Sequence, residues 1–286
     1  MSGHVLITGG TGNTGRRIAA RLGELGVSAR VASRAAGGGG DHVVFDWADP
    51  STHGPALSGV DRVYLIAPGM VEDPSTLMLP FLERALARGV GRFVLLSSSA
   101  IPEGAPGLGT VDRFLRERAP GFAILKPSWF MQNFVDPKHP HGSSLIGEGK
   151  VVTSTGAGRV GFVDPDDIAE VAVRALVDET SHDTAHVITG PEALAYSEVA
   201  AILERVTGRP MRHVHVDDDE ARRRLVAAGM PEAYAALLVG LDVAIRGGAE
   251  DRVTDTVLRV TGRAPRSFEA FARAHAQVFR SGDRIG

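Results

Sequence analysis

Near its N-terminus the chain carries the stretch VLITGGTGNTGRRIAARL, which begins at Val5. A continuous apolar run comes first and a run with helical spacing follows, which predicts a buried strand, a turn and a helix. Gly9, Gly12 and Gly15 stand three residues apart in this turn. Glycine lets the backbone approach an anion closely, and a helix N-terminus attracts negative charge. The stretch therefore predicts a binding site for the pyrophosphate of a dinucleotide, with a glycine-rich turn that binds no ligand as the alternative.

Strand-like and helix-like segments alternate after this turn. Further strands are predicted at 28–33, 42–45, 61–67, 92–97, 122–127 and 185–189, and helices at 77–87, 111–118 and 168–176. Such alternation is typical of crossover units and a parallel sheet. We expect an α/β fold, a doubly wound Rossmann sheet with a smaller, mainly helical C-terminal lobe, since the patterns after Gly190 are mostly helical.

The predicted division into domains follows from the change, after Gly190, from alternating strands and helices to mostly helical patterns. We expect a Rossmann core over 1–135 with a returning segment near 160–190, and a substrate-binding lobe from 136–160 and 191–286. The segment DPKHPHGS at 136–143 holds two prolines, two histidines and a glycine, which predicts a loop or a lid. His139 and His141 have no third ligand at a supporting spacing, so we predict no metal site.

The end of the second strand indicates which dinucleotide binds. An acidic residue about 20 positions after the glycines would bind the ribose of NAD. This chain has Ser33 and Arg34 there and no acidic residue before Asp41. Arginine can pair with a 2′-phosphate, so NADP(H) is preferred; a solvated loop arginine is the alternative.

Other cofactor contacts are expected at the carboxyl ends of the parallel strands. The predicted cofactor-binding residues are Gly9, Thr11, Gly12, Asn13, Thr14, Gly15, Ser33, Arg34, Asp46, Trp47, Ala67, Pro68 and Ser97.

Composition narrows the class of protein. The 286 residues are 43% hydrophobic, carry a net charge of −3 and include no cysteine, which excludes disulfides and thiolate chemistry. No basic block, signal peptide or membrane-length apolar run is present, so we expect a cytoplasmic protein, monomeric or homodimeric, that binds a small molecule and neither nucleic acid nor membrane.

Several motifs together resemble a known family. TGGTGNTG, SR, FVLLSSSAI, LKPSWFMQNF and FVDPDDIAEVA resemble the NmrA-like atypical short-chain dehydrogenases. LIAPGMVEDP, HVITGPEALAYSEVAAILERVTGRPM, AAGMPEAYAALL and GAEDRVTDTVLRVTGRAPRSFEAF are similar to the festuclavine and agroclavine dehydrogenases of ergot-alkaloid synthesis. The resemblance implies a Rossmann domain, NADPH and the reduction of a small electrophile, which is a cyclic iminium in the fungal relatives.

One departure from the wider family is informative. Most short-chain dehydrogenases have a catalytic YxxxK pair, but the corresponding segment GLGTVDRFLRER holds neither residue. Hydride transfer to an iminium or a quinone needs no protein acid at the reacting atom, whereas reduction of a simple ketone does. We therefore expect an iminium, a quinone or an activated enone as substrate, with Ser98 and Asp112 as catalytic candidates; a solvated or helix-pairing role is the alternative for Asp112.

The substrate pocket is expected beside the sixth strand. Its predicted lining consists of Ser99, Trp129, Phe130 and Met131. For the aromatic side chains of Trp129 and Phe130, packing in the protein core is the alternative. Two other functions stay open: a non-catalytic NADP(H)-sensing regulator, which also fits the missing pair, and an isomerase or epimerase that recycles its cofactor.

Overall fold

The computed structural model describes residues 4–35, 41–69 and 71–280. The chain divides into two compact units, each built from three segments. Unit 1 comprises residues 1–127, 165–188 and 259–262, and unit 2 comprises 128–164, 189–258 and 263–286. The chain first leaves unit 1 at Pro127, earlier than the residue 135 expected from the sequence.

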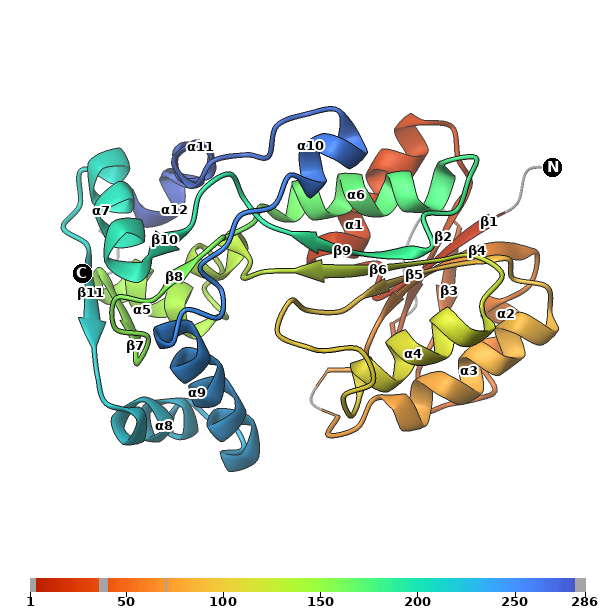
Figure 1. Ribbon diagram of the computed structural model, residues 1–286, viewed down its shortest axis with the longest axis horizontal. Helices are drawn as coiled ribbons and strands as arrows, with labels where there is room; N and C mark the ends of the chain where they lie inside the picture. The colour runs from red at the N-terminus through yellow and green to blue at the C-terminus, as the bar shows by residue number, and fades with distance from the viewer. Residues whose placement is uncertain (1–3, 36–40, 70, 281–286) are drawn as a thin grey trace. The chain divides into compact units, whose positions relative to one another are not determined.

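Unit 1 is built on a seven-stranded parallel sheet (Figure 1), which confirms the predicted fold class. The strands run in the order β3-β2-β1-β4-β5-β6-β9. Their bounds are β1 His4–Thr8, β2 Ala29–Ser33, β3 His42–Val44, β4 Val60–Ile66, β5 Arg92–Leu96, β6 Phe122–Pro127 and β9 Thr184–Ile188. The strand order reverses between β1 and β4, and ligands of such sheets bind beyond the carboxyl ends at that point.

Helices cover both faces of this sheet. In Figure 1, α1 and α6 lie on one face and α2, α3 and α4 on the other. Their bounds are α1 Asn13–Glu24, α2 His53–Ala56, α3 Ser75–Ala87, α4 Leu108–Arg118 and α6 Pro165–Val177. The first turn of α6 carries Asp166 and Asp167, which suits the positive end of the helix dipole, and Asp166 pairs with Arg17 of α1.

Unit 2 is mainly helical, as predicted, but it also holds two small sheets that the sequence did not suggest. β7 (Lys150–Thr153) pairs in parallel with β11 (Arg212–His215), and β8 (Arg159–Val160) pairs antiparallel with β10 (Leu194–Ala195). The helices are η1 Met131–Phe134, α5 Pro140–Glu148, α7 Tyr196–Thr207, α8 Asp218–Ala227, α9 Glu232–Arg246, α11 Phe268–His275 and α12 Gln277–Arg280, and α10 Thr256–Thr261 spans the boundary between the units.

The segment 136–143, predicted as a loop, is partly helical. His139 is the N-cap of α5, its Nδ1 accepts a hydrogen bond of 3.2 Å from the backbone N–H of His141, and Pro140 occupies the first turn. Proline suits that turn because its missing N–H has no partner there in any case. The prediction was wrong for residues 140–143 because two prolines were weighed as loop markers when one of them starts a helix.

Candidate functional site: the glycine turn of unit 1 and a cavity of unit 2

The glycine turn after β1 has the geometry that its sequence predicts. Gly9 adopts a left-handed conformation, with φ of +60°, and its carbonyl accepts a hydrogen bond of 2.9 Å from the N–H of Gly12. Gly12 caps the N-terminus of α1. A Cβ on Gly15 would lie 2.5 Å from the carbonyl oxygen of Gly9, so only glycine lets α1 start this close to the turn.

Two further observations fit a dinucleotide at this turn. The first turn of α1 has no acidic side chain, so the positive end of its dipole remains available to an anion. Across the same sheet edge, the Ser97 hydroxyl after β5 is buried without a hydrogen-bond partner in the described part of the chain. A buried hydroxyl of this kind is suited to a polar ligand.

The hydroxyl groups of the turn differ in their surroundings. Thr11 is exposed and Asn13 is half-buried, so both side chains remain accessible. Thr14 is buried, and its Oγ1 accepts a hydrogen bond of 3.0 Å from the Tyr64 hydroxyl. The Thr14 side chain therefore supports the turn through Tyr64, while its backbone N–H lies in the first turn of α1.

The predicted 2′-phosphate and adenine contacts follow β2 and β3. Arg34 is exposed directly after β2, whereas the Ser33 hydroxyl donates to the carbonyl of Ala35 at 2.9 Å. The Asp46 carboxylate accepts from the Ala48 N–H, and Trp47 packs edge-on against Phe45 and Phe81. The half-buried Ala67 and Pro68 follow β4.

The two catalytic candidates, Ser98 and Asp112, already form hydrogen bonds or ion pairs with neighbouring residues. The Ser98 hydroxyl accepts a hydrogen bond of 3.2 Å from the Ala100 N–H, and the Ser99 N–H donates to the carbonyl of Pro127. Asp112 on α4 is fully buried and lies 2.6 Å from Arg116 Nε and 3.0 Å from Lys126 Nζ. These ion pairs favour a structural role for Asp112 over the proton transfer considered from the sequence.

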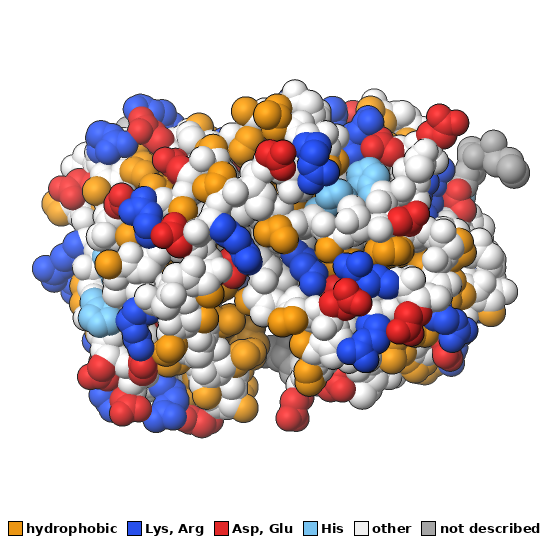
Figure 2. All heavy atoms as spheres, viewed as in Figure 1, with side chains coloured by type: hydrophobic (Ala, Val, Ile, Leu, Met, Phe, Trp, Pro, Cys, Tyr) orange, Lys and Arg blue, Asp and Glu red, His pale blue; other side chains and the backbone are white. Residues whose placement is uncertain are grey.

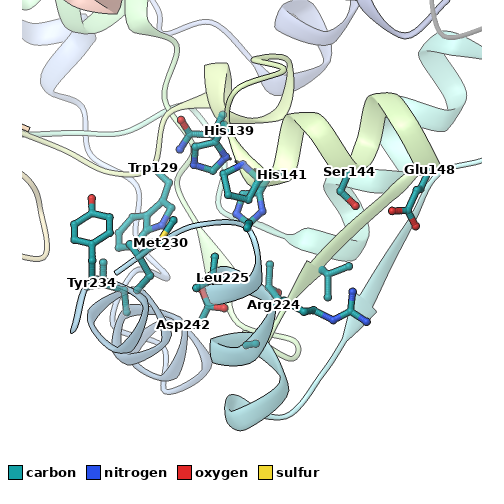
Figure 3. A pocket seen from close by; sticks show the side chains of 18 residues that line it. Trp129, His139, His141, Ser144, Glu148, Arg224, Leu225, Met230, Tyr234 and Asp242 are labelled. Carbon is teal, nitrogen blue, oxygen red and sulfur yellow. Dashed lines mark hydrogen bonds between the residues drawn. The ribbon is translucent and has the colours of Figure 1, made fainter. Parts of the chain in front are cut away.

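Unit 2 encloses a cavity of about 530 Å³, which is large enough for a small ligand (Figure 3). Its walls come from the segment after β6, from α5, β7, α8 and α9, and from the turn between α8 and α9. The lining residues are Trp129, Asn133, His139, Pro140, His141, Ser144, Glu148, Val152, Thr153, Ala221, Arg224, Leu225, Ala228, Met230, Tyr234, Leu238, Leu241 and Asp242.

Only Trp129 of the predicted pocket residues lines this cavity. Met131 is buried in the core of unit 2, Phe130 forms a β-bridge with Val163, and Ser99 belongs to unit 1. The expectation that Met131 lines a pocket does not hold for this cavity, because the turn of η1 directs its side chain into the core. The contribution of α9 was not predicted, although Asp242 within the apolar run AYAALLVGLDVAI was a visible signal.

Burial controls the charge of the titratable groups in the cavity. It lowers the pKa of His139 to about 4, and together with the neighbouring His139 and His213 it lowers the pKa of His141 to about 3. Both imidazoles are therefore neutral at pH 7. Burial raises the pKa of Asp242, and a hydrogen bond from the Ser154 N–H opposes this rise.

Some other kinds of site are absent from the described residues. Within residues 4–35, 41–69 and 71–280, no group of three His, Cys, Asp or Glu is placed to hold a metal ion, and no helix is long and apolar enough to span a membrane. On the face shown in Figure 2, basic and acidic side chains are intermixed, so no extended basic surface forms there.

No model of a protein family matches the chain. It is 47% identical over 279 residues to the uncharacterized oxidoreductase YesF of Bacillus subtilis, covering 97% of this chain and 96% of that protein. It is 35% identical to the agroclavine dehydrogenase of Claviceps fusiformis, covering 96% of this chain and 98% of that protein. Its fold is similar to the NADPH-dependent quinone oxidoreductase QOR2 of Escherichia coli in complex with NADPH, with a TM-score of 0.80, 18% identity and coverage of 94% and 99%.

These relatives match almost the whole chain, so the similarity includes both the glycine turn and the helical segments of unit 2. They confirm the resemblance read from the sequence motifs and the prediction of an oxidoreductase. The chain belongs to the family of the agroclavine and festuclavine dehydrogenases.

Proposed function

We propose that this chain is an NADPH-dependent reductase that transfers hydride to a small electrophile: a cyclic iminium, a quinone or an activated enone. NADPH supplies the hydride when it is bound. The glycine turn and the α1 N-terminus would hold its pyrophosphate, Arg34 its 2′-phosphate and the Ser97 hydroxyl a polar group of the cofactor. The relatives named as dehydrogenases and the NADPH complex of QOR2 support this assignment.

The choice of electrophile depends on one observation: neither the buried acid of α4 nor the tyrosine beside the glycine turn is placed to give a proton to a substrate. On α4, where the wider family has its YxxxK pair, the buried acid is Asp112, which is ion-paired with Arg116 and Lys126. Tyr64 is fully buried, and its hydroxyl donates a hydrogen bond to Oγ1 of Thr14. An alkoxide formed from a ketone would need an acid, whereas an amine formed from an iminium would not.

The cavity of unit 2 supports the same choice of acceptor. His139 and His141 line it as neutral imidazoles, which are poor acids at pH 7. Tyr234 also lines it and is the one described tyrosine that is exposed. If the acceptor is an iminium or a quinone, replacing Tyr234 by Phe leaves kcat nearly unchanged, whereas a ketone reductase that used this phenol would lose most of its rate.

The test is the decay of NADPH absorbance with purified protein and a panel of cyclic iminium ions, quinones, activated enones and simple ketones. We expect turnover of at least one of the first three classes and none of the ketones, with NADH as a slower donor. Ketone turnover that the Y234F variant abolishes would overturn the acid-free mechanism. Tight NADPH binding without any turnover would favour the NADP(H)-sensing regulator, and product formation without net NADPH consumption would favour an isomerase.

A further inference from the structure

The cavity of unit 2 contains one carboxylate without a cationic partner. Asp242 Oδ2 accepts a hydrogen bond of 2.9 Å from the Ser154 N–H, with the Ser154 hydroxyl at 3.4 Å. Asp242 forms no ion pair with any Lys, Arg or His of the described chain, and its Oδ1 accepts no hydrogen bond from the residues described. This side chain is half-buried, so its negative charge is only partly hydrated.

The other charged groups at the cavity are already neutralised. Arg224 Nε lies 2.8 Å from Glu220, and Glu148 lies 3.1 Å from Lys150 Nζ. The positive charge of Arg246 lowers the pKa of Asp242, but the Arg246 guanidinium is already bound to another carboxylate. It donates hydrogen bonds of 2.8 and 3.0 Å to the two carboxylate oxygens of Asp218. Because the two histidines are neutral as well, Asp242 is the one carboxylate of the described cavity lining that forms no ion pair.

Apolar and aromatic side chains form the rest of the wall near this carboxylate. Trp129, Met230 and Tyr234 lie together on one side of the cavity in Figure 3, while Ser144 and Glu148 lie on the other. Leu238 and Leu241 precede Asp242 on the same helix and also line the cavity. Aromatic faces attract cations, and flat apolar walls suit a ring system.

We propose that Asp242 is a specificity-determining residue: it is the counter-ion that makes this cavity select a planar, positively charged acceptor over a neutral one of the same shape. The proposal rests on the proposed function and narrows it to a cationic iminium. In that reaction the hydride of NADPH adds to the iminium carbon, the C=N π pair moves to nitrogen, and a neutral amine and NADP⁺ result. No proton enters at this step.

The charge balance also predicts which kinetic constant Asp242 controls. The carboxylate stabilises the bound cation, whose positive charge is partly lost as hydride arrives in the transition state. An interaction that is stronger in the ground state than in the transition state improves binding without raising kcat. Replacing Asp242 by Asn is therefore expected to raise KM for a cationic acceptor, with kcat unchanged or higher.

Binding of a pair of unreactive isosteres tests the proposal separately from turnover. The probes are the N-methylquinolinium ion and 1-methylnaphthalene, which differ in charge but hardly in shape, titrated calorimetrically into the full chain with and without NADP⁺. We expect the wild type to prefer the cation by about tenfold or more, as an unscreened carboxylate at a few ångströms allows. The D242N variant should lose this preference, and D242E should keep part of it.

Glu148→Gln is the matched control, because it removes an acidic side chain of the same cavity that is mostly exposed, so solvent screens its charge and that of its partner Lys150. This variant should keep the preference for the cation, and thermal unfolding should show that D242N remains folded. Equal affinity of the wild type for the two probes, or a preference that survives in D242N, would overturn the assignment of Asp242. Neither result would bear on NADPH consumption, so failure of this proposal is distinguishable from failure of the proposed function.

Discussion

The hydroxyl of Tyr64 on β4 donates a buried hydrogen bond of 3.0 Å to Oγ1 of Thr14 in the first turn of α1. This contact joins the strand next to β1 with the helix that starts at the glycine turn. Burial raises the pKa of the Tyr64 hydroxyl, so this phenol does not exchange protons with a substrate at neutral pH. The role of Tyr64 is therefore to support the glycine turn and the start of α1.

Removing this hydrogen bond should lower stability and leave the chemistry intact. Tyr64→Phe is expected to reduce the free energy of unfolding by about 1 kcal/mol, and Thr14→Val by about 1–3 kcal/mol because it leaves the phenol hydroxyl buried without a partner. Urea unfolding measures both, and the kcat of Y64F should stay within about twofold of wild type, in line with its position outside the chemistry. Additive losses in the double variant would show that the two groups are not coupled.

Gly15 and Gly23 provide a matched pair within α1. Gly15→Ala places a Cβ 2.5 Å from the Gly9 carbonyl oxygen, so we expect a loss of about 1–3 kcal/mol in unfolding free energy and at least tenfold weaker NADPH binding. A Cβ on Gly23 meets nothing within 4 Å, so Gly23→Ala should stabilise the helix by up to about 1 kcal/mol. Urea unfolding and NADPH titration of both variants measure these effects. Equal behaviour of the two variants would contradict the close approach at Gly15.

Arg34 should set the preference for NADPH. Arg34→Glu is expected to weaken NADPH binding by about 100-fold, since a charge-assisted hydrogen bond contributes about 1.5–3 kcal/mol and the reversed charge repels the 2′-phosphate. NADH binding should change by less than about threefold, since NADH lacks that phosphate. Fluorescence titration with each dinucleotide measures the two constants, with Arg212→Glu, an exposed position in unit 2, as the charge-matched control. Equal losses for the two dinucleotides would rule out a contact with the 2′-phosphate.

The buried histidines should make the protein less stable in acid. His141 has a folded pKa of about 3, whereas an unfolded histidine binds a proton below about pH 6.5. Between these values the unfolded state binds more protons, so the free energy of unfolding falls as pH falls. His141→Phe removes one such proton and should reduce the slope of stability against pH, between pH 4.5 and 6, by up to about 1 kcal/mol per unit.

Denaturant unfolding at several pH values measures this slope. His139 is also expected to contribute, so the H141F variant should keep part of the wild-type slope. An unchanged slope in H141F would mean that His141 is protonated as readily in the folded protein as in the unfolded one.

Local sequence patterns predicted unit 1 well. Its strands are continuous apolar runs, and the turn after β1 carries glycines because its backbone is left-handed at Gly9 and closely approached at Gly15. The Gly9–Gly15 turn, the helix that follows it and the alternation of strands with helices were readable in this way. The same patterns could not separate side chains that face a ligand from those that support the turn. Thr14 belongs to the second group because its partner Tyr64 is fifty residues away in the sequence.

The cavity of unit 2 was less predictable because it depends on contacts between distant segments. Trp129, His141 and Asp242 line it together, although they belong to the segment after β6, to α5 and to α9. The two-residue strands β8 and β10 are too short for any hydrophobic period to show. A lone aspartate in an apolar helix was visible in the sequence, but the side chains around it were not.

The interleaving of the two units determines when the sheet can be completed during protein synthesis. The ribosome delivers β1 to β6 first, then residues 128–164 of unit 2, and only afterwards α6 and β9. Until β9 emerges, the nascent sheet ends at β6 with unpaired backbone groups and with apolar side chains such as Leu125 lacking the neighbour strand. We expect nascent chains at this stage to depend most on chaperones, and a fragment that ends at Pro127 to aggregate.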